Sequence, residues 1–220
     1  DVLYFVPLGD TCEVQRVTLR NTGAVPKHVK LFSFTEWCFW NAHDDQTNFQ
    51  RNFSTGEVEV EEGVIYHKTE YRERRNHYAF HSVNSPVAGF DTDRETFLGI
   101  YNGFDRPETV FSGRPRNSIA HGWSPVASHC LEVVLEPGEV KEYIFVLGYI
   151  ENPETEKFIA PKVINKVRAK AMIGRYDTSE KVDVAFAKLK EYWDSQLSVI
   201  SLNHPDPRLE RMVNTWNPYQ

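Results

Sequence analysis

Residues 131–148, LEVVLEPGEVKEYIFVLG, predict two antiparallel strands joined by a tight turn. Leu131, Val133 and Leu135 occupy every second position, which is the period of a strand that buries one face. A Pro-Gly pair at 137–138 then marks a turn, and the apolar run after it returns the chain. We therefore expect a β-hairpin here and a β-rich fold around it.

The same pattern recurs upstream of this stretch. Apolar residues alternate or cluster at 17–19, 29–34, 58–60 and 64–66. Turn signals separate these runs, namely Asn21-Thr22-Gly23, Gly56 and Gly63. Short strands at this spacing predict a mainly β fold, an antiparallel β-sandwich over residues 1–150.

Beyond residue 150 the apolar period becomes helical. Residues 162–173 predict a short helix that stops before Gly174, and Ser179 is suited to cap a longer one. The apolar stripe of that longer helix comprises Val182, Ala185, Phe186, Leu189, Tyr192, Trp193, Leu197 and Ile200. We expect the aromatic residues of this stripe to lie in a core. The part of the chain after residue 150 is therefore predicted to be helical.

A further helix is predicted to start at Asp206-Pro207, because proline is favoured at the first helical position. Its apolar face comprises Leu209, Met212, Val213 and Trp216. Residues 206–220 thus predict another helix. The chain starts without methionine inside a strand pattern and stops inside this helical one, so we expect a fragment of a longer enzyme.

Composition excludes several classes of function. The formal net charge of −6 disfavours nucleic acid as a partner, since phosphate binding needs a basic excess. Cys12, Cys38 and Cys130 show no metal-binding or paired spacing, which favours reduced thiols and a cytoplasmic location. The histidines form no HxH or HExxH motif, so no metal site is expected. No apolar run approaches the roughly 20 residues of a membrane span.

Residues 36–81 carry the strongest functional signal. Trp37, Phe39 and Trp40 stand beside a run of amide side chains: Asn41, Gln46, Asn48, Gln50 and Asn52. Aromatic faces and amides that both donate and accept hydrogen bonds suit a sugar-binding surface. A polar loop that satisfies its own backbone has the same composition, so both interpretations stay open.

The charged residues of this segment also allow two interpretations. Asp44 and Asp45 are adjacent, so on a strand they would point to opposite faces and could not act as a facing acid pair. Capping of a loop is the simpler role for them. The run EYRERR at 70–75 fits cross-strand ion pairs, or a subunit contact or anion site built on arginine.

Several motifs together resemble the inverting disaccharide phosphorylases of glycoside hydrolase family 94, and among them the cellobiose phosphorylases. They are NAHDD at 41–45, TNFQRN at 47–52, STGEVEV at 54–60, IYHKTEYRERRNHY at 65–78, GFDTDRE at 89–95 and RMVNTWN at 211–217. The resemblance extends over nearly the whole chain and is most specific over residues 41–80. Pro218 departs from the glutamine expected there, so we expect either that the last helix ends early or that this position carries an error.

The resemblance implies a super-sandwich-like N-terminal β domain, a helical linker, an (α/α)6-barrel catalytic domain and a small C-terminal β domain. On this map residues 1–150 are the later part of the sandwich, residues 151–205 the linker, and residues 206–220 the first barrel helix. The catalytic residues of the family lie in the barrel. None is therefore expected in this chain, which alone should be inactive.

The resemblance also implies a glycosyltransferase reaction, the reversible and inverting phosphorolysis of cellobiose to α-glucose 1-phosphate and glucose. Inorganic phosphate is the co-substrate, and no cofactor is expected. Family members are homodimers whose sandwich approaches the partner's active-site mouth. The residues expected to serve substrate access or subunit contact are Asn41, Asp45, Asn48, Gln50, Arg51 and Asn52.

Two alternatives stay open. The chain could be a stand-alone carbohydrate-binding or dimerisation module, which the aromatic and amide composition of residues 36–53 favours. It could also belong to a related phosphorylase that acts on another β-linked disaccharide. The residues that would separate these substrates lie in the barrel.

Overall fold

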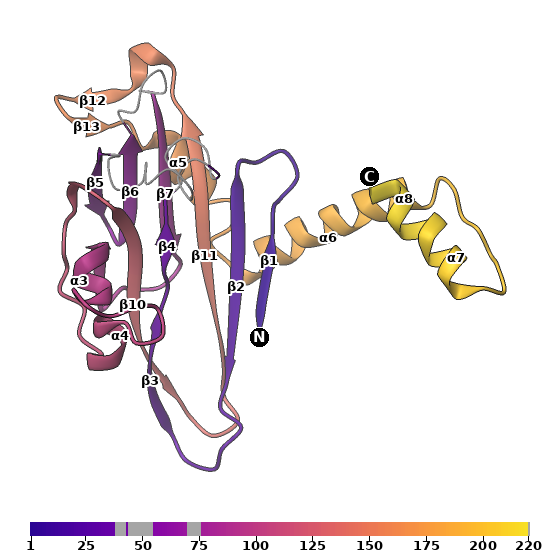
Figure 1. Cartoon of the computed structure of the whole chain (residues 1–220), viewed down its shortest axis with the longest axis horizontal. Coiled ribbons are helices and arrows are strands. Elements are labelled where there is room, and N and C mark those ends of the chain that lie inside the picture. Colours follow the sequence, from indigo (N-terminus) through magenta and orange to yellow (C-terminus); the bar gives the residue numbers. More distant parts are fainter. Residues whose placement is uncertain (38–42, 44–54, 70–75, 220) are drawn as a thin grey trace.

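The computed structural model describes residues 1–37, 43, 55–69 and 76–219. Two antiparallel sheets face each other and helices follow them (Figure 1). The larger sheet has the order β1 (Val2–Phe5), β2 (Cys12–Arg20), β11 (Val140–Glu151), β7 (His77–Val83), β6 (Val64–Thr69), β5 (Thr55–Glu61) and β9 (His121–Trp123). In the smaller sheet, β10 (Pro125–Leu135) pairs with β3 (Lys27–Phe32), β4 (Thr35–Glu36) and β8 (Gly89–Asp93). The prediction of a mainly β, antiparallel sandwich is confirmed.

The predicted hairpin at residues 131–148 is wrong in one respect. Both strands form, but β10 belongs to the smaller sheet and β11 to the larger one. The turn at 136–139 therefore carries the chain across the sandwich. Leu131, Val133 and Leu135 of β10 pack against Tyr143 and Phe145 of β11 in the core between the sheets. The apolar faces of β10 and β11 pack against each other, and both are buried.

Asn21 holds this crossing in place. The chain crosses between the sheets a second time from β2 to β3, directly after Asn21. The Asn21 side chain is 1% exposed and donates to the carbonyls of Leu135, at 2.9 Å, and Val25, at 2.8 Å. Its own carbonyl accepts from the Gly138 N–H at 2.9 Å. One asparagine thus joins the two crossing turns by satisfying buried backbone groups.

β5 and β6 form a true hairpin in which Glu61 lies opposite Val64. Glu62 and Gly63 make the turn, and both have positive φ, 53° and 78°. This combination suits a two-residue turn between twisted strands. The strands predicted at 58–60 and 64–66 are therefore present and paired with each other.

An excursion between β8 and β9 contains α3 (Arg94–Leu98) and α4 (Glu108–Ser112). The fully buried Asp91 organises it by accepting hydrogen bonds from the Ser118 hydroxyl at 2.8 Å and the Thr109 hydroxyl at 3.2 Å. It also accepts from the backbone N–H groups of Ser118 at 3.1 Å and Arg116 at 3.2 Å. A buried carboxylate needs such donors in place of water.

After β11 come the short η1 (Glu154–Glu156), the hairpin of β12 (Phe158–Ala160) and β13 (Val163–Ile164), α5 (Val167–Ile173) and α6 (Ser179–Leu197). α5 and the first part of α6 cover the outer face of the larger sheet. Ile164, Ala169 and Met172 pack on Tyr78 and Ile150 of the sheet. The helix predicted at 162–173 begins later, at Val167, because residues 163–164 pair with β12 instead. Gly174 ends it, as predicted.

α6 differs from the prediction in its N-cap and in the burial of its aromatic residues. Thr178 rather than Ser179 is its N-cap, and the Thr178 hydroxyl accepts from the Lys181 N–H at 3.4 Å. Within α6, Val182 is the buried residue, whereas Tyr192 and Trp193 are each 43% exposed. The expected aromatic core is therefore wrong for the chain as described. Figure 1 shows the reason, since the later part of α6 runs away from the sheets.

The last helix starts where it was predicted. The Asp206 carboxylate accepts from the Arg208 N–H at 2.9 Å and caps α7 (Pro207–Arg211). A π-helical turn, η2 (Met212–Trp216), and α8 (Asn217–Tyr219) continue it through Pro218, so the expected early end is wrong. None of the described helices is long and apolar enough to cross a membrane.

Candidate functional site

The six predicted access residues lie outside the residues that the structure describes. They are Asn41, Asp45, Asn48, Gln50, Arg51 and Asn52. Their roles stay a prediction. The structure does describe the strands that enter and leave this part of the chain, and a groove at the end of β11.

Trp37, at the start of the aromatic and amide segment, belongs to the core. It is 5% exposed and stacks on the buried His67 ring, with centroids 5.4 Å apart and an interplanar angle of 13°. Burial lowers the pKa of His67 to about 3, so this imidazole is neutral at physiological pH. Trp37 is therefore not an exposed platform for a sugar ring.

An ion-pair ladder fixes the linker to the β5–β6 hairpin. Lys166, just before α5, is 6% exposed and its Nζ lies 2.6 Å from Glu59 Oε2 and 3.0 Å from Glu61 Oε2. Lys170 continues the ladder, with its Nζ 2.7 Å from Glu61 Oε1. Burial opposes the charge of Lys166, but hydrogen bonds to the two glutamates outweigh it and raise its pKa. A partly buried ladder of this kind holds α5 in position over the sheet.

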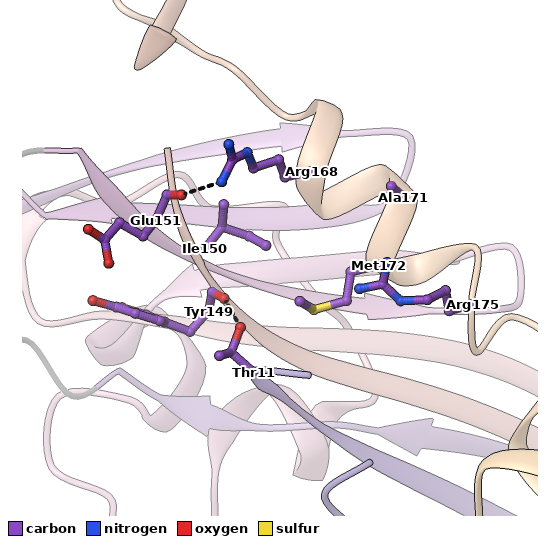
Figure 2. Close-up of a pocket in the computed structure, with 8 residues that line it drawn as sticks. All are labelled: Thr11, Tyr149, Ile150, Glu151, Arg168, Ala171, Met172 and Arg175. Atoms are coloured by element: carbon purple, nitrogen blue, oxygen red, sulfur yellow. Dashed lines mark hydrogen bonds between the residues drawn. The ribbon is translucent and has the colours of Figure 1, made fainter. Parts of the chain in front are cut away.

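A groove of about 410 Å³ lies between the end of β11 and α5 (Figure 2). It forms because β11 continues past its neighbour: β2 begins at Cys12, opposite Gly148, and only Thr11 extends the pairing. The Thr11 hydroxyl donates to the Tyr149 carbonyl at 2.6 Å. Residues 150 and 151 lie beyond this pairing, and α5 stands over them.

The groove has an apolar floor and polar walls. Ile150 and Met172, each 5% exposed, belong to the core beneath it. Tyr149 is 39% exposed, and Arg168 donates to the Glu151 carbonyl at 3.0 Å (Figure 2). The remaining lining residues are Ala171 and Arg175.

His77 connects the side chains of Tyr149 and Glu151 at the end of β11. Its Nδ1 hydrogen-bonds the Tyr149 hydroxyl, and its Nε2 lies 3.6 Å from Glu151 Oε1. The His77 ring meets the Tyr149 ring edge-on at 5.3 Å. These contacts hold the Tyr149 ring on the face of β11 opposite to Ile150 (Figure 2).

A second cavity of about 480 Å³ adjoins the groove and shares Glu151 and Arg168 with it. Asn76 and Asn152 line it, and the Asn76 Nδ2 donates to the Asn152 carbonyl at 2.7 Å. Asn152 is 1% exposed, and its Oδ1 has no hydrogen-bond partner among the described residues. A buried acceptor in this state costs about 1–3 kcal/mol.

A hydrogen-bonded cluster of Asp10, Arg175 and Tyr176 lies at the other end of the groove. Asp10 accepts hydrogen bonds from Arg175 Nη2 at 2.6 Å and Nε at 2.9 Å, and also from the Tyr176 hydroxyl. Burial, and then the hydrogen bond to Asp10, raise the pKa of Tyr176. Burial also raises the pKa of the nearby Cys12 thiol to about 12, which keeps it protonated and unreactive. A bidentate pair of this geometry ties the α5–α6 turn to the loop after β1.

Sequence reasoning missed this groove. Its lining comes from residues near 11, 76, 149–154 and 168–175, which no local motif connects. The available signals were indirect: His77 and Asn76 close the charged run that the sequence singled out, and Tyr149 interrupts the apolar pattern of β11.

The comparison with family models identifies one family. The family model described as glycosyl hydrolase 94, supersandwich domain, matches residues 1–179. N,N'-diacetylchitobiose phosphorylase of Vibrio furnissii is 27% identical over 98% of this chain and 25% of its own length. Solabiose phosphorylase of Paenibacillus borealis is 23% identical over 96% of this chain and 26% of its own length. The cyclic beta-(1,2)-glucan synthase NdvB of Rhizobium meliloti (strain 1021) is 23% identical over 93% of this chain and 7% of its own length. The chain thus spans about a quarter of the two phosphorylases.

Proposed function

This chain belongs to the glycosyl hydrolase 94 supersandwich domain family, and we propose that it is the sandwich and linker portion of an inverting disaccharide phosphorylase. The observation that carries the proposal is the family match over most of the chain, together with phosphorylase relatives that align along nearly all of it. The full protein would be a glycosyltransferase acting on a disaccharide and inorganic phosphate.

The proposed reaction requires little of the sandwich itself. A phosphate oxygen attacks the anomeric carbon from the face opposite the leaving sugar, and the glycosidic C–O bond breaks. One carboxylic acid donates its proton to the departing oxygen. Phosphate already carries the negative charge of the nucleophile, so the second carboxylate of an inverting hydrolase has no task. We place this acid outside the present chain, whose role is then to support the catalytic domain and the homodimer.

Cellobiose is the disaccharide that the sequence motifs favour. The phosphorylase relatives carry other substrate names, diacetylchitobiose and solabiose. We therefore propose a β-linked disaccharide as the substrate class, with cellobiose as the first candidate. We further propose a cytoplasmic enzyme that needs no organic or metal cofactor.

The test is a product assay on the full-length protein that contains this chain. Incubation with phosphate and cellobiose, diacetylchitobiose or solabiose is expected to release a sugar 1-phosphate of inverted configuration from one of them. NMR of the anomeric proton measures both identity and configuration. Release of free sugar alone, independent of phosphate, would contradict the proposal.

Gln50 and Arg51 are expected to contribute to saccharide binding or subunit contact in that enzyme. Alanine at both positions should raise KM for the disaccharide about tenfold, or weaken the dimer, because hydrogen bonds worth about 1 kcal/mol each are lost. Steady-state kinetics and analytical ultracentrifugation measure the two effects. Alanine at the exposed Gln196 and Arg114 provides a control matched in residue type. Unchanged kinetics together with an unchanged dimer would rule out this role.

A further inference from the structure

We propose that Asn102-Gly103 is a site of spontaneous deamidation, which places aspartate or isoaspartate on the surface of the folded protein. The sequence contains this dipeptide once. It lies in the loop between α3 and α4, beside the smaller sheet (Figure 1). The modification is independent of the substrate that the full-length enzyme uses.

The reaction needs these two residues, hydroxide and water. The backbone nitrogen of Gly103 loses its proton to hydroxide and attacks Cγ of Asn102, which forms a new C–N bond. The bond from Cγ to the side-chain nitrogen then breaks, and that nitrogen takes a proton from water and leaves as ammonia, which regenerates hydroxide. Water opens the resulting five-membered succinimide at either of its carbonyls. The products are aspartate and isoaspartate at position 102.

The structure leaves both reacting groups free. Asn102 and Gly103 are exposed, and neither belongs to a helix or strand. The Asn102 side chain and the Gly103 N–H have no hydrogen-bond partner within the described chain. The turn is closed through other groups: the Asn102 N–H donates to the Gly99 carbonyl at 3.3 Å. The Gly103 carbonyl accepts from the Arg106 N–H at 3.2 Å. No bond to the nucleophile or to the side-chain amide has to break before attack.

Glycine at position 103 removes a steric barrier to ring closure. A Cβ on the attacking residue crowds Cγ of the asparagine, whereas glycine allows close approach. Gly103 does not have a positive φ. A Cβ added there would meet the end of the exposed Asp105 side chain, with Oδ1 at 2.8 Å, and that side chain is able to move away. The fold should therefore tolerate alanine at this position, which makes the barrier testable.

Two asparagines that precede serine are held by the fold instead. Asn84 is bonded at both ends of its amide, since Nδ2 donates to the Asp177 carbonyl at 3.2 Å and Oδ1 accepts from the Ile144 N–H at 2.8 Å. Asn117 Oδ1 accepts from the Phe90 N–H at 3.0 Å. These side chains must give up hydrogen bonds before they cyclise. The fold should protect them, whereas it leaves Asn102 unprotected.

Isoaspartate would lengthen the backbone by one methylene beside an aromatic contact. Phe104 packs against Phe34 with ring centroids 5.3 Å apart. The Arg94 guanidinium lies 5.4 Å from the centroid of the Phe104 ring. We expect the longer backbone at position 102 to displace Phe104 and loosen the contact of this loop with Phe34.

Peptide mapping by mass spectrometry tests the site in the full-length protein, both folded and in urea, at one mildly alkaline pH. The peptide that carries Asn102 should gain the mass difference between asparagine and aspartate and separate into two products. Its rate in the folded protein should lie within about threefold of its rate in urea, because opening an exposed loop costs almost no free energy. Asn84 and Asn117 should react at least about tenfold faster in urea than in the folded protein.

Asn102→Gln should abolish the change, because its longer side chain forms the ring far less readily, and Gly103→Ala should slow it about tenfold. Asn203→Gln is the matched control and should leave the rate at Asn102 unchanged. Asn203 is also exposed, with no side-chain hydrogen bond within the described residues, but it precedes a histidine, whose Cβ hinders attack. A folded protein that reacts at Asn102 more than about threefold slower than in urea would overturn the inference. An unchanged rate in Gly103→Ala would also overturn it.

Discussion

Lowering the pH from 7.5 to 5 is expected to reduce the free energy of unfolding by about 4–6 kcal/mol, because three buried histidines must stay neutral in the fold. His81 and His129 stack between the sheets with ring centroids 5.0 Å apart, and each ring hydrogen-bonds the Ser33 hydroxyl at 3.2 Å. His129 Nε2 also hydrogen-bonds the Gly63 carbonyl at 2.9 Å. His67 is buried against Trp37.

The loss of stability at low pH follows from the lowered pKa values of the three buried histidines. Burial lowers the pKa of His129 to about 4 and that of His67 to about 3. Burial, followed by repulsion from His129, lowers the pKa of His81 well below its ordinary value. The unfolded chain takes up these protons near pH 6.5. The stability contributed by the neutral histidines is therefore complete above pH 6.5 and is lost as the pH falls toward 4 and 3.

Hydrogen exchange of peptides from β7 and β10, measured at several pH values, gives the free energy of opening and its slope. The slope near pH 5 should correspond to about three protons taken up on unfolding. His81→Leu should lower the uptake by about one proton. His28→Gln changes an exposed histidine on β3 and is the matched control. A wild-type uptake below one proton, or a slope unaffected by His81→Leu, would contradict the neutral cluster.

Gly148→Ala is expected to reduce the free energy of unfolding by about 3 kcal/mol, because the added methyl has no space. Gly148 lies in β11 opposite Phe80 of β7, and a Cβ there would overlap the Phe80 ring. Phe80 is fully buried in the core beneath the helices, so its ring cannot turn outward. The strand must therefore shift or the core must repack.

Gly174→Ala is the matched control. Gly174 ends α5 with φ −63°, and a Cβ there would make only ordinary contacts, the nearest being 3.5 Å from the Lys170 carbonyl oxygen. Alanine should be neutral there or stabilise by about 0.5 kcal/mol through the unfolded state. Thermal unfolding of the two variants measures the difference. Combining Gly148→Ala with Phe80→Leu should cost less than the sum of the single changes. Equal stability of the two alanine variants would rule out the steric argument.

Strand positions were largely predictable from the sequence, because alternation with period two directly reports a half-buried strand. The segments at 58–60, 64–66 and 131–135 all lie in strands. Helix starts were predictable where a cap provides a local signal, as at Asp206 and Pro207. The start of α5 was not, because Val163 and Ile164 fit a helix equally well and only their pairing with β12 excludes it.

The candidate groove could not have been predicted in the same way. Thr11, Tyr149 and Arg168 are far apart in the sequence. They come together only because β11 extends beyond the start of β2 and α5 folds back over the end of β11. The position of Trp37 could not be predicted for a related reason. An aromatic residue beside amides has the same local pattern whether it faces solvent or, as here, stacks on a buried His67.

The sequence by itself thus determined the β character, the positions of the main turns, the change to helices after residue 150 and the family. Each of these depends on neighbours within a few residues along the chain. Only the tertiary structure decided which strands pair, that the 136–139 turn crosses the sandwich, and which polar residues gather at the end of β11. The physical reason is that alternation fixes which face of a strand is apolar, whereas the partner of that face is selected by packing across the whole domain.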